Sequence, residues 1–382
     1  MRMHSGPGLA LAAIVAAAPA AGQASFRTEP APDWDAFYDR HFGWTGADGC
    51  YSIPLSGVHS PGTGDLAPTV FTYGDTFVGR IDPKTGERLP GSTIVNNTFS
   101  GYFPAADRMR FLVRRDEQGQ PRAVFIPNTP NSQPGEWYWP ADGFVNLERD
   151  GDLTIFHFRL RGPGFHGVGT SLVIIPRDAA NPIEEHRQVE LPLFFPGDDE
   201  RKPRSFGTGV IVNTEWAGAP NPDGYLYVYG HEERAAKRFL VCRTRPADIE
   251  DPTAWRFWNG SEWVEEITQA RGLFNAVTGG ITAENLPDGR VIAMYADFGG
   301  NIMARIGESP SGPFGPAFRL YRTPEVDLDP DVYTYNPIPH PHLSRPGELL
   351  VVYSVNSFEF LDLFEHADWF RPRFFRVILE DR

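Results

Sequence analysis

Cysteines, basic residues and long apolar segments are all scarce in this sequence. Two cysteines in 382 residues exclude a disulfide scaffold and every zinc module built from several cysteines. Cys50 and Cys242 either form one disulfide across the fold or remain two buried free thiols. The 35 Lys and Arg residues are outnumbered by 49 Asp and Glu residues. The net charge of −14 argues against nucleic acid or an anionic membrane as partner, because both require clustered cations.

The one marked apolar segment lies near the start of the chain, over residues 9–21. It is shorter than the ~20 residues that are needed to cross a bilayer. Arg2 precedes it and Gly22 and Ala24 follow it, which is the pattern of a secretory signal peptide. We therefore expect a signal peptide at 1–24 and a single domain at 25–382. The mature protein is expected to be secreted or periplasmic, without membrane attachment.

Glycine, proline and aromatic residues are abundant instead. The sequence has 39 Gly, 36 Pro and 13% aromatic residues, and no segment keeps a helical periodicity. This composition is typical of short strands joined by frequent turns. Five aromatic-rich strands are predicted, at 70–77, 153–160, 225–230, 291–296 and 349–355. Glycine-containing hairpin turns are predicted at 149–151, 222–224, 287–289 and 345–347.

A recurring strand pattern predicts the fold. Third strands are expected at 170–177, 239–245 and 302–308, and fourth strands at 255–258 and 318–321. The fold class is therefore an all-β, five-bladed β-propeller with four-stranded antiparallel blades, and the alternative is a large β-sandwich. Glycine-rich inner strands at 206–209 and 278–280 suit a crowded central channel. The blades are expected to start near Asp48, Asp142, Gly207, Gly280 and Asn336.

Two aspartates in the first predicted hairpin are the strongest chemical signal. If its strands pair symmetrically about Pro61 and Gly62, Asp48 lies opposite Asp75. Cross-strand neighbours have Cβ atoms ~5 Å apart, and two carboxylates this close titrate at separate pH values. One is then available as an acid and the other as a base or nucleophile, as glycoside hydrolysis requires. The alternative is that each aspartate, next to a glycine, only stabilises a turn.

Aromatic and polar residues near the predicted channel are candidates for substrate binding. Indole and phenol rings stack on sugar faces, so Trp44, Trp137 and Trp139 are expected as walls of the binding site, although packing between blades is the alternative. The predicted substrate-binding set is completed by Tyr51, Asp142, Asn336 and His340.

Metal binding has weaker support from the sequence. His340 and His342 are two residues apart and face one way on a strand, which allows a metal ion, but no third ligand is near. The flanking prolines favour a role as hydrogen-bonding groups at the rim. We therefore predict no metal and no cofactor.

Several of these motifs resemble those of a known family. The phrases at 47–55 and 73–79, and later ones at 139–143, 225–230, 309–314 and 353–356, are similar to bacterial exported propeller proteins of the endo-D-arabinanase type, glycoside hydrolase family 183. The resemblance implies hydrolysis of arabinofuranosyl linkages in a mycobacterial-type cell-wall arabinan. It also implies that Asp48 and Asp75 are the essential acidic pair. This chain has a longer hairpin at 56–68, which leaves the linkage and the endo or exo mode open.

The expected function is therefore a secreted glycoside hydrolase that cleaves a D-arabinan-like polysaccharide with a pair of carboxylates. The expected partner is this poly- or oligosaccharide, and the protein is expected to be a monomer. Two alternatives remain: a non-catalytic glycan-binding propeller that uses the same aromatic face, and a metal-dependent propeller hydrolase that uses His340 and His342.

Overall fold

The computed structural model describes residues 26–275 and 280–379. The predicted signal peptide at 1–24 and two residues of the glycine-rich segment, Thr278 and Gly279, lie outside the described residues. Within the described ranges, no helix combines the length and the apolar character needed to cross a membrane.

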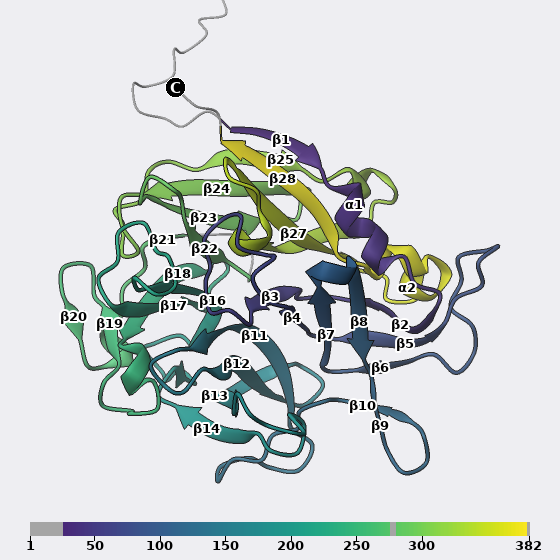
Figure 1. The fold of residues 1–382 in the computed structure, drawn as a ribbon, viewed down its shortest axis with the longest axis horizontal. Helices are drawn as coiled ribbons and strands as arrows, with labels where there is room; N and C mark the ends of the chain where they lie inside the picture. The colour runs from purple at the N-terminus through teal and green to yellow at the C-terminus, as the bar shows by residue number, and fades with distance from the viewer. Residues whose placement is uncertain (1–25, 276–279, 380–382) are drawn as a thin grey trace, which may run out of the picture.

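The described chain is built from antiparallel sheets and very short helices, which confirms the all-β prediction (Figure 1). The helical segments include α1 (Pro32–Asp35) and α2 (Asp362–Glu365). The first sheet contains β3 (Tyr51–Pro54), β4 (Thr69–Tyr73), β7 (Thr98–Phe103) and β8 (Arg108–Leu112), and a three-stranded extension contains β2 (Phe42–Ala47), β5 (Thr76–Arg80) and β6 (Thr93–Val95). A two-stranded ribbon follows, made of β9 (Arg114–Arg115) and β10 (Pro121–Arg122).

The next two sheets cover the middle of the chain. One contains β11 (Trp137–Asn146), β12 (Asp152–Arg161), β13 (His166–Ile175) and β14 (Arg187–Leu191). The other has seven strands, more than the four predicted: β15 (Phe194–Phe195), β16 (Arg204–Asn213), β17 (Tyr225–Glu232), β18 (Arg238–Thr244), β19 (Arg256–Trp258), β20 (Trp263–Val264) and β21 (Phe274–Asn275). The extra strands are short and add to the two edges of the sheet and to β18.

The last two sheets complete the molecule. One contains β22 (Thr282–Asn285), β23 (Val291–Ala296), β24 (Asn301–Gly307) and β25 (Phe318–Arg322). The other contains β26 (Val332–Pro339), β27 (Glu348–Ser357), β28 (Arg373–Leu379) and, at its outer edge, β1 (Phe26–Pro30). Phe26 pairs with Leu379 and Pro30 with Phe375, so the two ends of the described chain share one sheet. This pairing was not predicted from the sequence.

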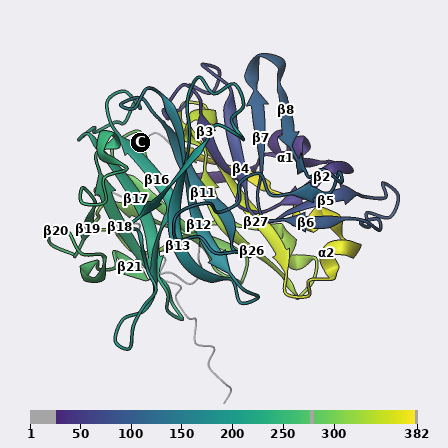
Figure 2. The same ribbon diagram turned by 90° about the horizontal axis from the view of Figure 1, so that it is seen from below.

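The first strands of the sheets lie around a common centre, as the blades of a propeller do (Figure 1 and Figure 2). β11 contacts β3 on one side and β16 on the other, β16 contacts β22, and β22 contacts β26. The last sheet returns to the first through side chains: Ser52 Oγ lies 2.6 Å from His340 Nδ1, and Thr69 Oγ1 lies 3.1 Å from His342 Nε2. The inner strands of the sheets are therefore neighbours of one another around the centre of the molecule.

The local predictions hold along most of this path. The five aromatic-rich runs form β4 with β5, β12, β17, β23 and β27. Gly151, Gly224, Gly289 and Gly347 have positive φ in the predicted hairpin turns, where other residues would be strained. Cys50 and Cys242 are both free and buried, so the disulfide alternative is not realised.

Candidate active site

Asp48 and Asp75 face each other across the first hairpin. Asp48 lies between β2 and β3, and Asp75 between β4 and β5. On one side of the pair Ala47 is opposite Thr76, and on the other Tyr51 is opposite Thr72. The Asp48 N–H donates to the carbonyl of Asp75 at 3.3 Å, and the Gly74 N–H donates to the carbonyl of Asp48 at 2.9 Å. The predicted register is therefore confirmed, in spite of the long 56–68 loop between the strands.

Gly74 allows the two aspartates to approach each other. A Cβ atom at this position would lie 2.5 Å from Asp48 Oδ1. Any side chain here would therefore push the carboxylate of Asp48 out of place. The glycine next to Asp75 thus has a steric function as well as a place in the turn.

The two carboxylates receive different hydrogen bonds. Trp139 Nε1 donates to Asp75 Oδ1 at 2.9 Å, and Asn96 Nδ2 donates to the same oxygen at 3.1 Å. Burial raises the pKa of Asp75, while these two donors oppose the rise because they stabilise the ionised form. Asp48 Oδ2 accepts one hydrogen bond, from the Tyr335 hydroxyl at 2.6 Å. Burial and the nearby charge of Asp75 raise the pKa of Asp48 to about 7.

Two further carboxylates lie near the centre. Asp142 sits at a bulge in β11, between Pro140 and Gly143, and accepts hydrogen bonds from the N–H groups of Gly143 at 2.8 Å and Val210 at 2.7 Å. Burial raises its pKa to about 7. Glu284 in β22 accepts from the Asn285 N–H at 2.7 Å, and burial together with the charge of Asp142 raises its pKa to about 8.

No lysine or arginine forms a salt bridge with these four carboxylates in the part of the chain that the structure describes, and none contributes to their pKa shifts. Without a fixed cation, a buried carboxylate tends to keep its proton at neutral pH. Asp48, Asp142 and Glu284, with pKa values of about 7, 7 and 8, therefore hold protons at mildly acidic pH that are available for transfer. Perturbed carboxyls of this kind mark candidate active sites.

Trp137 and Trp139, two of the predicted aromatic walls, lie beside this pair. The Trp139 indole is stacked on Phe165 with a centroid distance of 5.4 Å, while its N–H bonds Asp75. Trp137 meets Phe165 edge-on at 6.2 Å. Both tryptophans are half-buried and Phe165 is exposed, so these rings connect the surface to Asp75.

The prediction for Trp44 is wrong. Its side chain is 1% exposed and is packed in the core against Tyr38, Tyr73 and Phe111. Its Nε1 donates to Thr98 Oγ1 at 3.1 Å. A sugar cannot stack on this ring, because neighbouring side chains cover it. The alternative, that Trp44 is a packing residue, therefore applies.

His340 does not lie at the rim of a binding site, where it was predicted to bind substrate. It is fully buried, and burial lowers its pKa to about 3, so the imidazole is neutral. Both His340 and His342 bond side chains of the first sheet and so connect it to the last sheet. They act between sheets and do not reach a binding surface. Among the described residues, no group of three or more His, Cys, Asp or Glu side chains is arranged to hold a metal ion.

Tyr51 is buried close to Asp48 and Asp142, and Asn336 is half-buried next to Tyr335. Tyr51 is 5% exposed, and burial and the charges of Asp142 and Asp48 raise its pKa. Asn336 has a positive φ of 50° beside the bulge in β26, and it is packed against Gly280, where a Cβ atom would lie 1.7 Å from Asn336 Oδ1. Contact of either residue with a substrate remains a prediction.

Two residues of the site were not predicted in their roles. Tyr335 and Asn96 each donate to one member of the aspartate pair. Tyr335 lies in β26, ahead of the two histidines, and Asn96 belongs to none of the predicted motifs. Only contacts between residues that are distant in sequence bring these side chains to the aspartate pair.

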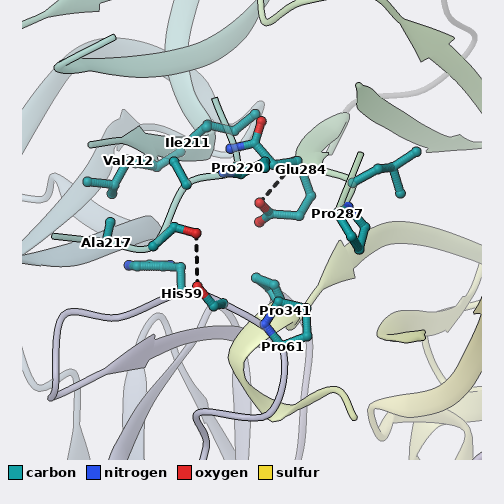
Figure 3. Close-up of a pocket in the computed structure, with 15 residues that line it drawn as sticks. His59, Pro61, Ile211, Val212, Ala217, Pro220, Glu284, Pro287 and Pro341 are labelled. Atoms are coloured by element: carbon teal, nitrogen blue, oxygen red, sulfur yellow. Dashed lines mark hydrogen bonds between the residues drawn. The ribbon is translucent and has the colours of Figure 1, made fainter. Parts of the chain in front are cut away.

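A separate cavity of about 220 Å³ lies where the 56–68 loop meets the loop after β16 (Figure 3). His59 and Pro61 line it from the first loop, Ala217 and Pro220 from the second, and Glu284 points into it. The Ser60 hydroxyl donates to the Gly218 carbonyl at 2.9 Å and so joins the two loops. Glu284 lines this cavity, whereas Asp48 and Asp75 do not.

Comparison with known protein families identifies the family of this chain. A family model described as "Domain of unknown function (DUF5005)" matches residues 32–379, and the chain therefore belongs to that family. No functionally curated protein matches the sequence.

Solved structures share the fold. A Bacteroides ovatus protein provisionally assigned as a hydrolase has a TM-score of 0.69 at 17% identity, over 92% of this chain and 90% of its own. A single-site mutant of the B. megaterium levansucrase, a propeller enzyme, has a TM-score of 0.50 at 12% identity, over 88% of this chain and 85% of its own. At these identities the likeness extends to the fold, which is an all-β, propeller-like architecture.

Proposed function

We propose that this DUF5005 protein is a glycoside hydrolase that uses Asp48 and Asp75 to cleave arabinofuranosyl linkages in a D-arabinan-like cell-wall polysaccharide. The observation that carries the proposal is the pair itself. Two aspartates face each other in a fixed register, no cation neutralises them within the described residues, and their hydrogen bonds differ. Paired carboxyls with different environments are the equipment of glycoside hydrolysis.

The environments assign different roles to the two carboxyls. Asp48, whose pKa is about 7, keeps its proton at mildly acidic pH and donates it to the oxygen of the leaving sugar. Asp75 is stabilised as a carboxylate by the N–H groups of Trp139 and Asn96. Asp75 acts on the face of the sugar opposite the leaving group, as the base for a water molecule or as the nucleophile. Tyr335 orients Asp48 through its hydroxyl group.

We also propose the number of blades, the secretion of the protein and its oligomeric state. The five inner strands are β3 with β2, β11, β16, β22 and β26, so we propose five blades, the last closed by β1. The protein is proposed to be secreted after cleavage at 1–24 and to act as a monomer. The net charge of −14 is compatible with a neutral polysaccharide.

A non-catalytic glycan-binding protein is the second candidate. It is favoured by the aromatic rings of Trp137, Trp139 and Phe165, which offer a stacking surface whether or not a bond is cleaved. The two candidates make opposite predictions for turnover.

The test is incubation of the wild-type protein with a panel of arabinans and related furanosides, followed by chromatography of the products. We expect release of arabinose oligosaccharides, and loss of that release in Asp48→Asn and Asp75→Asn with binding retained. Asp288→Asn is the matched control, because Asp288 also precedes a turn glycine but bonds only its local neighbours, among them Arg290. Turnover that survives in both site variants would refute the mechanism, and turnover lost on chelation would favour a metal-dependent hydrolase.

A further inference from the structure

Three of the most exposed phenyl rings of the described chain connect to the aspartate pair. Phe165, Phe298 and Phe358 are 56%, 50% and 62% exposed. Phe165 lies in the turn between β12 and β13, Phe298 in the turn between β23 and β24, and Phe358 directly after β27. Segments far apart in the sequence thus present aromatic rings to solvent, although exposure of phenylalanine has a cost in water.

Phe298 and Phe358 form a cluster with Tyr333 of β26. Tyr333 is stacked on Phe358 at 4.4 Å, Phe298 meets Tyr333 edge-on at 5.6 Å, and Phe298 lies 5.9 Å from Phe358. Tyr333 in turn lies 5.4 Å from Tyr335, whose hydroxyl bonds Asp48. Burial and the charge of Asp48 raise the pKa of Tyr333 to about 12, as expected for a ring close to this carboxyl.

Phe165 belongs to a second cluster, with Trp137 and Trp139, and this cluster connects to Asp75 through the Trp139 N–H. The second cluster comes from the sheet of β11 to β14, whereas Tyr333 and Phe358 come from the last sheet and Phe298 from the sheet before it. The sheet of β11 and the last sheet lie on opposite sides of the first sheet. β11 contacts β3 and β4 on one side, and the last sheet bonds β3 and β4 through its histidines on the other (Figure 1). Each member of the aspartate pair therefore has its own aromatic cluster.

We propose that Phe298, Tyr333 and Phe358 form a second sugar-binding platform, opposite the Trp137–Trp139–Phe165 platform. The inference rests on the proposed function, since the occupant is the polysaccharide substrate. Aromatic faces stack on the C–H faces of sugar rings while the hydroxyl groups stay in water. With a platform beside each carboxyl, sugar units bind on both sides of the cleaved bond. The enzyme then selects polymers over short substrates.

The test compares a long arabinan with a small aryl arabinofuranoside, which reaches the carboxyls but not the platform. In the double variant Phe298→Ala and Phe358→Ala we expect kcat/KM to fall about tenfold on the polymer, and less than about twofold on the small substrate, because only the polymer loses stacking. Phe358→Trp should keep polymer activity. Phe42→Ala is the control, since Phe42 is 70% exposed at the far end of β2. Equal losses on both substrates, or no loss, would overturn the platform.

A second measurement separates this inference from the proposed function. Retention on immobilised arabinan is measured for the Asp75→Asn protein, with and without the two platform substitutions. Weaker retention in the substituted protein supports the platform even if the wild type releases no sugar, an outcome that would refute only the hydrolase. Unchanged retention refutes the platform. A changed oligomeric state with unchanged retention assigns the rings to contact with a second copy of the chain, and also overturns the proposal.

Discussion

Two groups of carboxylates in this molecule differ in their partners. Glu232 is 2% exposed and is bonded by Arg204 at 2.8 Å, by Arg238 at 3.5 Å and by Arg234. Burial alone would raise its pKa, but the hydrogen bonds from Arg234 and Arg204 outweigh burial and lower it. Asp48 and Asp75 have neutral donors instead, and their pKa values are raised. The comparison shows that a structural carboxylate is recognised by its guanidinium partners, and a candidate catalytic one by their absence among the described residues.

The largest effect expected from this comparison is on turnover. Asp75→Asn removes the proposed base and should lower kcat on arabinan by about 10²- to 10⁴-fold. Its melting temperature should stay equal or rise, because a buried like charge next to Asp48 disappears. Product release and thermal unfolding of the same preparation provide the check. Normal turnover in this variant would show that Asp75 has a structural role, like Glu232, and is not the base.

The next effect is on stability, at the other group. Glu232→Gln leaves Arg204, which is 7% exposed, without an anionic partner. We expect the free energy of unfolding to fall by about 3 kcal/mol, with turnover unchanged in the protein that remains folded. Urea unfolding at constant pH measures it. Glu29→Gln, at an exposed pair with Arg27, serves as control and should change stability by less than about 0.5 kcal/mol.

A smaller effect is expected on the pH profile. The Tyr335 hydroxyl stabilises the ionised form of Asp48, so Tyr335→Phe should raise the pKa of that carboxyl further from its usual value. Because Asp48 acts while protonated, the alkaline limit of kcat/KM should move to higher pH, by about one unit. Measurement of kcat/KM from pH 4 to 9 tests the assignment. A shift of the acidic limit instead would exchange the roles of Asp48 and Asp75.

The smallest effect concerns stability against pH. Glu284 and Asp142 have folded-state pKa values of about 8 and 7, above those of an unfolded chain. The folded state therefore binds more protons, and its stability is full at low pH and lost as pH rises through these values. We expect the melting temperature to fall between about pH 4, near the unfolded pKa values, and about pH 8, and Glu284→Gln to reduce that fall by a few degrees. An identical pH dependence in the variant would mean that Glu284 is ionised in the folded protein.

The strands and the register of the aspartate pair were predictable because their signals are local. Asp-Gly turns and aromatic runs dictate hairpins, and pairing symmetric about 61–62 brings Asp48 opposite Asp75 on both sides of the break between β2 and β3. The interior or exterior position of single rings was not predictable. Trp44 is covered by Tyr38, from the helical turn just before β2, and by Phe111 of β8, which is distant in sequence.

The sequence by itself determined that this is an all-β chain of hairpins with two facing aspartates, because turn chemistry and strand pairing act over short distances. Only the tertiary structure decided what surrounds those aspartates. It brought Trp139 and Tyr335 to them from two other sheets, and directed His340 into a contact between sheets. It also connected β1 to β28 at the end of the chain. These features depend on which sheets become neighbours, and burial and hydrogen bonding across those contacts set the pKa values on which the proposed chemistry rests.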